Sequence, residues 1–403
     1  MGDFFQNGRI TTLHKMNERP IEALEAELLA FSKHRPMSLV LPSLYSELSG
    51  PALPGILEEI ARVPYLREIV IGLDRAREAE FDFAREYFSR LPQHHRILWN
   101  DGPRLLALHK LLAGEGLAPQ ELGKGRNVWY CYGYIIASGK ADAVALHDCD
   151  ILTFKRALLA RLFYPVANPT FSYEFCKGYY YRAAENRLNG RVCRLLVTPL
   201  IRALMKIVGP MEYLEYLDSF RYPLAGEFSM RADAVKQIRI PSDWGLEIGV
   251  LSEIYRNHSL KHVCQAEIAD AYDHKHQPLS GDDRESGLSK MSIDITKAIY
   301  RKLATNGVVF NKEMFRTIKA TYFRIALDFV EMYYSDAKIN GYGFDRHAEE
   351  KTVELFSQNI MVAGERFLDN PMETPFIPSW NRVISAVPDI LERLFDAVEQ
   401  DNS

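Results

Sequence analysis

Two aspartates with one residue between them stand near the middle of the chain. The stretch Ala143–Ile151 begins as an apolar run, typical of a buried strand in a parallel sheet, and contains Asp148 and Asp150. Side chains alternate along a strand, so we expect both carboxylates to point the same way past its carboxyl end, where open α/β sheets bind ligands. Such carboxylates repel each other unless a cation sits between them, and a hard divalent ion also binds phosphate oxygens. The pattern indicates a metal and nucleotide-diphosphate site, although an acidic turn without a ligand has the same pattern.

A lysine between two glycines precedes this stretch. Gly123, Lys124 and Gly125 come directly before an apolar and aromatic segment, residues 128–137, that predicts a helix. Glycines let the backbone approach a ligand, and the helix dipole and the ammonium group both favour an anion there. The spacing differs from that of a Walker A loop. A phosphate-binding loop and a solvent-exposed turn are both consistent with these residues.

A further carboxylate and two histidines follow later in the chain. Glu247 lies in the first turn of a predicted, otherwise apolar helix, where it is either a partner of the helix dipole or a buried functional group. His274 and His276 come after a strand-like run, residues 263–269, and can face the same way. Neutral imidazole is a good metal ligand, whereas a lone histidine is more often structural.

The segment 154–210 is rich in aromatic and basic residues. Arg182, Arg187, Arg191 and Arg194 stand close to Tyr179–Tyr181 in the sequence. The planar guanidinium group matches the oxygens of a carboxylate or a phosphate, so this segment is a candidate site for a small anionic acceptor. The alternative is a core of aromatic rings beneath a solvated basic face.

The elements that must position these residues alternate between strand and helix. Strands are predicted at residues 37–42, 66–74 and 95–99, with helices at 51–62 and 78–91 between them. This alternation requires crossover connections and favours a parallel sheet. Beyond residue 287 the pattern changes to amphipathic helices, which we expect to pack on the α/β part and to support a dimer. These helices are predicted at residues 289–303, 312–335, 347–367 and 378–400.

Composition excludes several other classes of protein. The chain has 403 residues and a net charge of −4, which gives no electrostatic case for binding nucleic acid. Its five cysteines are scattered without a C-x-x-C pair, so neither a zinc knuckle nor a disulfide framework is indicated. No apolar stretch suits a signal peptide or a membrane span, and free thiols fit a reducing compartment, so we expect a cytoplasmic protein without a membrane partner.

Seven short motifs occur in an order that matches a known family. They are Pro42–Glu47, Gly123–Gly125, Asp148–Asp150, Gly190–Cys193, Pro223–Glu227, Trp244–Gly249 and His274–Leu279. Over roughly residues 37–290 the chain resembles the glucosyl-3-phosphoglycerate synthases, which are retaining glycosyltransferases of the GT-A fold. The fold implied by this resemblance is a mostly parallel, Rossmann-like α/β sheet flanked by helices, with a C-terminal helical extension.

The resemblance implies roles for particular residues. Donor binding is expected from Pro42, Ser43, Leu44, Tyr45, Glu47, Asp74, Lys124, Asp148, Trp244 and His276. Acceptor binding is expected from Gly190, Arg191, Val192, Cys193 and Glu247. Asp148, Asp150 and His274 would hold Mg²⁺ or Mn²⁺, and Glu247, Asp150 and Lys124 would be the catalytic groups.

The implied reaction moves glucose from a nucleotide-diphosphate glucose to 3-phosphoglycerate, for the synthesis of the compatible solute glucosylglycerate. Four positions depart from the family motifs: Tyr45, Cys193, Trp244 and His276 stand where the family has asparagine, threonine, tyrosine and asparagine. The departures leave open another donor or acceptor, such as GDP-mannose or glycerate, or a non-catalytic nucleotide-sugar-binding protein. The expected parts are an N-terminal helical segment 1–36, a donor half 37–152, an acceptor half 153–288 and a helical extension 289–403.

Overall fold

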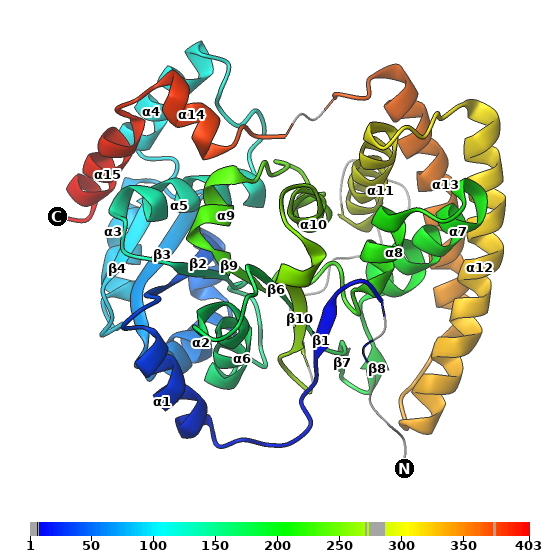
Figure 1. Ribbon diagram of the computed structural model, residues 1–403, viewed down its shortest axis with the longest axis horizontal. Helices are drawn as coiled ribbons and strands as arrows, with labels where there is room; N and C mark the ends of the chain where they lie inside the picture. The colour runs from blue at the N-terminus through cyan, green and yellow to red at the C-terminus, as the bar shows by residue number, and fades with distance from the viewer. Residues whose placement is uncertain (1–5, 7, 271, 274–286, 374–375) are drawn as a thin grey trace.

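The computed structural model describes residues 6, 8–270, 272–273, 287–373 and 376–403. Within these residues the strands form an eight-stranded sheet in the order β1-β10-β6-β9-β5-β2-β3-β4 (Figure 1) and a separate hairpin, β7-β8. The sheet is mostly parallel, and β9 runs antiparallel to both of its neighbours. The strands are Thr11–Leu13 (β1), Met37–Leu44 (β2), Leu66–Asp74 (β3), His95–Trp99 (β4), Ala143–Leu146 (β5), Phe175–Tyr179 (β6), Ala183–Ala184 (β7), Arg187–Leu188 (β8), Phe228–Arg231 (β9) and Val263–Glu267 (β10).

Helices cover both faces of the sheet and continue into the C-terminal extension. In the first half they are Ile21–Phe31 (α1), Leu53–Ile60 (α2), Glu78–Phe88 (α3), Pro103–Gly114 (α4), Lys124–Ser138 (α5), Arg156–Ala167 (α6), Thr198–Val208 (α7) and Glu212–Ser219 (α8). In the second half they are Ala232–Gln237 (α9), Leu246–Asn257 (α10), Gly287–Thr305 (α11), Lys312–Ile339 (α12), Arg346–Asp369 (α13), Trp380–Ala386 (α14) and Ile390–Asp401 (α15). Short helical turns occupy Tyr45–Ser49 (η1), Val192–Val197 (η2, a π-helix) and Leu260–His262 (η3).

The central strands are apolar on both sides because each side meets a different core. Leu39 and Leu41 of β2 pack with α1, α2 and α6, whereas Val40 between them packs with α5. The same alternation occurs in β3, where Ile69 and Ile71 face one core and Val70 faces the other. Strands buried on both faces are expected to be continuous apolar runs, which is why the sequence predicts them well.

The C-terminal part contacts the rest of the chain in two separate places. Helices α11, α12 and α13 stand together with α7 and α8 on one side of the molecule (Figure 1). The chain then returns to the far side, where α15 packs on α4, α5 and β4. There the Trp380 ring stacks on Trp129 with centroids 4.2 Å apart, and Asn402 Nδ2 donates to the Ile97 carbonyl at 2.8 Å. None of the helices in the described ranges is long and apolar enough to cross a membrane.

Several predicted elements are confirmed and others need correction. The strands at 66–74 and 95–99 have the predicted bounds, and the helix after Gly123 begins at Lys124, four residues earlier than predicted. The predicted helix 378–400 is wrong: it is two helices, α14 and α15, separated by residues 387–389, because Pro388 cannot continue a helix. The N-terminal segment 1–36 is helical only in part, since β1 within it joins the edge of the sheet beside β10.

Candidate active site

Three neighbouring parallel strands end where the predicted site residues gather. β2 lies between β3 and β5, and the three strands end at Leu44, Asp74 and Leu146. Asp148 and Asp150 lie beyond the end of β5 rather than on it. The alternation of side chains along a strand therefore does not orient them. The expectation that this alternation points both carboxylates the same way is wrong. The loop after β5 instead carries both carboxylates at the edge where open α/β sheets bind ligands.

Lys124, the first residue of α5, lies between two carboxylates. Its ammonium group donates to Asp148 Oδ1 at 2.7 Å and to Glu247 Oε1 at 3.2 Å. Burial opposes the ammonium charge, but the two carboxylates outweigh it and raise the pKa of Lys124 above its usual value. Because Glu247 is in the first turn of α10, this contact joins the N-termini of two helices to the loop after β5.

Two glycines let the backbone approach this cluster closely. A Cβ on Gly226 would lie 2.2 Å from Asp148 Oδ2, and a Cβ on Gly125 would lie 2.2 Å from the Pro241 carbonyl oxygen. A side chain at either position would overlap with its neighbour. Gly125 thus allows α5 to contact the segment before α10, and Gly226 allows the loop before β9 to contact Asp148.

Asp150 is half-buried and lies near other acidic groups. Burial and the charge of Asp148 raise the pKa of Asp150 to about 7, with smaller contributions from Glu47 and Glu227 and an opposing one from Lys124. Carboxylates that are buried and repel one another are a suitable donor set for a hard divalent cation, so Asp148 and Asp150 fit the predicted metal ligands. Among the described residues, no group of three or more His, Cys, Asp or Glu is placed to hold a metal ion.

The predicted third metal ligand, His274, and the predicted donor-binding residue His276 lie outside the described residues. Asp273, which precedes them, lies beside the segment that follows Asp150. The Leu152 amide donates to the Asp273 carbonyl at 2.9 Å, and the Asp273 amide donates to Thr153 Oγ1 at 3.1 Å.

The predicted donor-binding residues divide into exposed and buried groups. Of those at the end of β2 and in the following turn η1, Leu44 is exposed and Ser43 is buried, while Pro42, Tyr45 and Glu47 are half-buried. Trp244 is exposed in the loop before α10.

Asp74 is also buried and already makes two hydrogen bonds inside the protein. Its Oδ1 accepts from Arg126 Nη2 and from Asn100 Nδ2, both at 2.9 Å. Arg126 also donates to Asp101 Oδ1 at 3.1 Å. Sequence reasoning missed this arginine, although its place two residues after Lys124 was a signal that the same helix end carries a second cation.

The predicted acceptor loop begins at Gly190, whose φ of 73° is a conformation that favours glycine. Arg191 follows and donates from Nε to Glu349 Oε1 of α13 at 2.8 Å. Val192 and Cys193 are buried, and burial raises the pKa of the Cys193 thiol to about 12. Burial of this kind is typical of a cysteine that packs in the interior rather than of a reactive one.

A buried carboxylate at the end of the Pro223–Glu227 motif, to which the sequence analysis gave no role, lies close to the metal-ligand candidates. Glu227 is fully buried, and it accepts hydrogen bonds from the hydroxyls of Tyr180 at 2.6 Å and Tyr272 at 2.5 Å. The two tyrosine rings stack with centroids 3.7 Å apart. Tyr222 packs on Tyr180 and accepts from Arg182 Nη1 at 3.5 Å. These rings connect the Asp150 neighbourhood with the acceptor segment.

A buried lysine also contacts the Pro223–Glu227 motif. Lys177 Nζ donates to the Ala225 carbonyl at 2.6 Å, and burial lowers the pKa of Lys177 to about 8. The motif was visible in the sequence, but its contacts with Tyr180, Tyr272 and Lys177 were not.

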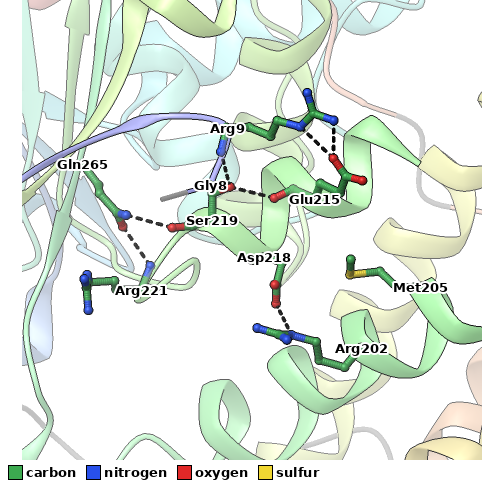
Figure 2. A pocket seen from close by; sticks show the side chains of 9 residues that line it. All are labelled: Gly8, Arg9, Arg202, Met205, Glu215, Asp218, Ser219, Arg221 and Gln265. Carbon is green, nitrogen blue, oxygen red and sulfur yellow. Dashed lines mark hydrogen bonds and ion pairs between the residues drawn. The ribbon is translucent and has the colours of Figure 1, made fainter. Parts of the chain in front are cut away.

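A separate cleft of about 470 Å³ lies where the N-terminal segment meets α7 and α8 (Figure 2). Its charged groups pair with one another: Arg9 Nε donates to Glu215 Oε2 at 2.7 Å, and Arg202 Nε donates to Asp218 Oδ1 at 2.6 Å. Figure 2 also shows that the Gln265 side chain donates to the Ser219 carbonyl and accepts from the backbone amide of Arg221. The Arg9 pair ties the N-terminal segment to α8, and the Arg202 pair ties α7 to α8. The cleft shares no residue with the cluster around Lys124.

Curated relatives match this chain over almost its full length. No family profile matches the chain. Two curated relatives are each named glucosyl-3-phosphoglycerate synthase. The protein from Persephonella marina is 46% identical over 100% of both chains. The protein from Methanococcoides burtonii is 37% identical over 98% of this chain and 97% of its own.

Solved structures support the fold. Glucosyl-3-phosphoglycerate synthase from Mycobacterium tuberculosis, in complex with Mn²⁺, uridine diphosphate and phosphoglyceric acid, is similar with a TM-score of 0.53 and 18% identity. The similarity covers 73% of this chain and 86% of the other. It confirms the GT-A architecture, with its mostly parallel sheet flanked by helices. On the evidence of the full-length relatives, the chain belongs to the glucosyl-3-phosphoglycerate synthase family and is a hexosyltransferase.

Proposed function

We propose that this enzyme transfers glucose from UDP-glucose or GDP-glucose to 3-phosphoglycerate and retains the configuration at the anomeric carbon. The bond between C1 and the nucleotide diphosphate breaks and a bond from C1 to the acceptor hydroxyl forms, with release of the nucleotide diphosphate and a proton. The observation that carries the proposal is the 46% identity, over the whole chain, with a protein named for this activity. The meeting of Lys124, Asp148 and Glu247 at the sheet edge supports it.

Asp148, Asp150 and His274 are proposed to hold Mg²⁺ or Mn²⁺. When bound, the cation neutralises charge on the leaving diphosphate. Related structures from M. tuberculosis were solved with Mn²⁺ or with Mg²⁺ together with uridine diphosphate. Lys124 would place a second positive charge beside the same leaving group.

The donor is proposed to lie along the end of β2 and the turn η1 that follows it. Pro42, Ser43, Leu44, Tyr45 and Glu47 would contact the nucleotide, with Trp244 and His276 near the sugar. Asp74 is assigned to the base or ribose. Its carboxylate is engaged by Arg126 and Asn100, so its remaining acceptor capacity is what the donor would use.

The acceptor is proposed to bind at Gly190–Cys193, with the Arg191 guanidinium paired to its anionic group. Glu247 would orient hydroxyls of the sugar or acceptor from the first turn of α10. Its contact with Lys124 supports this role, because the same ammonium group reaches the metal-ligand candidate Asp148. Positioning together with electrostatics then supplies most of the rate acceleration.

The proposed organisation keeps residues 37–152 as the donor half, 153–288 as the acceptor half, 289–403 as the helical extension and 1–36 as an N-terminal segment. A homodimer through the extension is part of the proposal. Met332 and Ile339 on α12 are exposed, and they are apolar groups that a partner subunit would cover. Light scattering tests the dimer, and a monomer at micromolar concentration would refute it.

A donor-by-acceptor screen tests the function. Purified enzyme with Mg²⁺ is given UDP-glucose, GDP-glucose or GDP-mannose, each with 3-phosphoglycerate or glycerate, and the released nucleotide and the product are measured. We expect turnover with a glucose donor and 3-phosphoglycerate, and an α-linked product by NMR. Turnover with another pair only would replace the substrate assignment and keep the fold. Nucleotide-sugar binding without turnover of any pair would favour the non-catalytic alternative.

A further inference from the structure

The helical extension packs on the acceptor segment and makes several hydrogen bonds to it. The Gly343 amide, between α12 and α13, donates to the Asn186 carbonyl at 2.8 Å. Tyr322 of α12 donates its hydroxyl to the Leu195 carbonyl inside the π-helix at 2.6 Å. Glu349 of α13 contacts the loop itself. A π-helix leaves carbonyl groups displaced from their usual partners, so the tyrosine contact stabilises a conformation that the segment alone would not favour.

Glu349 makes the strongest of these contacts, because its one buried carboxylate binds two guanidinium groups. Its Oε1 accepts from Arg191 Nε at 2.8 Å, and its Oε2 accepts from Arg194 Nη2 at 2.9 Å. The side chain of Glu349 is 5% exposed, that of Arg194 is 9% exposed and that of Arg191 is 34% exposed. The group therefore carries one excess positive charge, and Arg191 is the member that solvent or a ligand can reach.

Arg194 is held in place by contacts other than its pairing with Glu349. Its Nε donates to the Asn189 carbonyl at 2.8 Å, its guanidinium lies over the Tyr333 ring at 4.8 Å, and its Nη1 is buried without a hydrogen bond. Arg194 thus links the loop to Glu349 and is too buried to bind an acceptor. In the part of the chain that the structure describes, the Arg191 guanidinium makes one hydrogen bond, to Glu349, which leaves its other nitrogens for an anion.

We propose that Glu349 is a positioning residue for the acceptor. It holds Arg191 and Arg194 on one carboxylate and so fixes the Gly190–Cys193 loop with the Arg191 guanidinium presented to a phosphate or carboxylate group. The C-terminal extension then completes the acceptor site. This proposal rests on the acceptor role of Arg191 in the proposed function. The competing explanation is an ion pair that only joins the extension to the acceptor half.

Steady-state kinetics of full-length variants separate the two explanations. Glu349→Gln keeps the shape of the side chain and removes its charge, and Glu354→Gln, exposed on the same helix, is the matched control. We expect Glu349→Gln to raise the KM for 3-phosphoglycerate about tenfold, because a charge-assisted hydrogen bond to the loop is weakened. The KM for the donor and the melting of the control should stay at wild-type values. A stability defect alone would lower the amount of active enzyme without changing either KM.

The double variant Arg191→Ala/Glu349→Gln tests whether Glu349 acts through Arg191. If it does, Glu349→Gln adds little to the acceptor KM once Arg191 is absent. An unchanged acceptor KM in Glu349→Gln, beside a raised one in Arg191→Ala, would overturn the positioning role and leave the proposed function intact. A lowered acceptor KM would also overturn it, because Glu349 would then compete with the acceptor. An unchanged acceptor KM in Arg191→Ala would instead refute the acceptor role of the loop.

Discussion

Substituting Gly226 by alanine should damage the site through one added methyl group. The new Cβ would lie 2.2 Å from Asp148 Oδ2 and 3.1 Å from Lys124 Nζ, whereas real Cβ contacts essentially never fall below 3.0 Å. The Asp148 carboxylate must therefore move by about 0.8 Å, the difference between 3.0 and 2.2 Å. It cannot move without disturbing its 2.7 Å contact with Lys124. A displacement of about 1 Å at a reacting centre costs roughly 100-fold in rate, so we expect kcat/KM to fall by about that factor.

Two assays on the same preparation test this reasoning. Turnover reports the site, and urea unfolding reports the cost of overpacking, which we expect to be about 1–3 kcal/mol. Gly55→Ala is the matched control: Gly55 lies in α2 with no atom within 4 Å of its added Cβ, so it should leave turnover unchanged. It should also gain about 0.5–1 kcal/mol of stability from helix propensity. A Gly226→Ala enzyme with wild-type kcat/KM would refute the placement of Asp148 at the reacting centre.

The remaining predictions concern the lysine, the tryptophan pair and the C-terminal helix. Lys124→Met should lower kcat about 100-fold, since it removes the cation between Asp148 and Glu247, and an unchanged kcat would contradict its role. Gly133→Ala should lose about 1–3 kcal/mol by chemical denaturation, because its Cβ would lie 2.1 Å from Trp380 Cζ2; the gain normal for alanine in a helix would show that this packing is wrong. Hydrogen bonds from Arg96, and then Tyr134, lower the pKa of Glu399 below 4.5, so its stabilisation is present at neutral pH and is lost as pH falls through the lowered pKa. Glu399→Gln should therefore cost about 1 kcal/mol at pH 7 and nothing in strong acid, and a cost that is independent of pH would contradict this account.

Local patterns predicted the parts of the fold that repeat a simple period. The strand containing Val70 is buried on both faces, so its continuous apolar run was legible in the sequence. Lys124 and Asp148 could also be singled out from the sequence, because Lys124 stands before a predicted helix and Asp148 stands near the end of a predicted strand. The split of the last predicted helix was missed because amphipathic spacing continues on both sides of Pro388.

Ion pairs between residues far apart in the chain could not be predicted from the sequence. Glu349 stands 158 positions from Arg191, and its place in the first turn of α13 suits an ordinary partner of the helix dipole. Asp74 and Arg126 are each charged in the sequence, but only the packing of α5 against β3 brings them within 2.9 Å. Sequence shows where charge is present, and the three-dimensional fold decides which opposite charge it meets.

Glucosyl transfer is proposed to depend on the carboxylates that the loop after β5 carries. The most direct test is the turnover of Asp150→Ala with a glucose donor, 3-phosphoglycerate and saturating Mg²⁺, beside a thermal unfolding curve of the same sample. We expect a folded protein whose turnover is lower by about two orders of magnitude or more, because the metal-ligand set loses a carboxylate. A folded Asp150→Ala enzyme with wild-type turnover would contradict the assignment of this site.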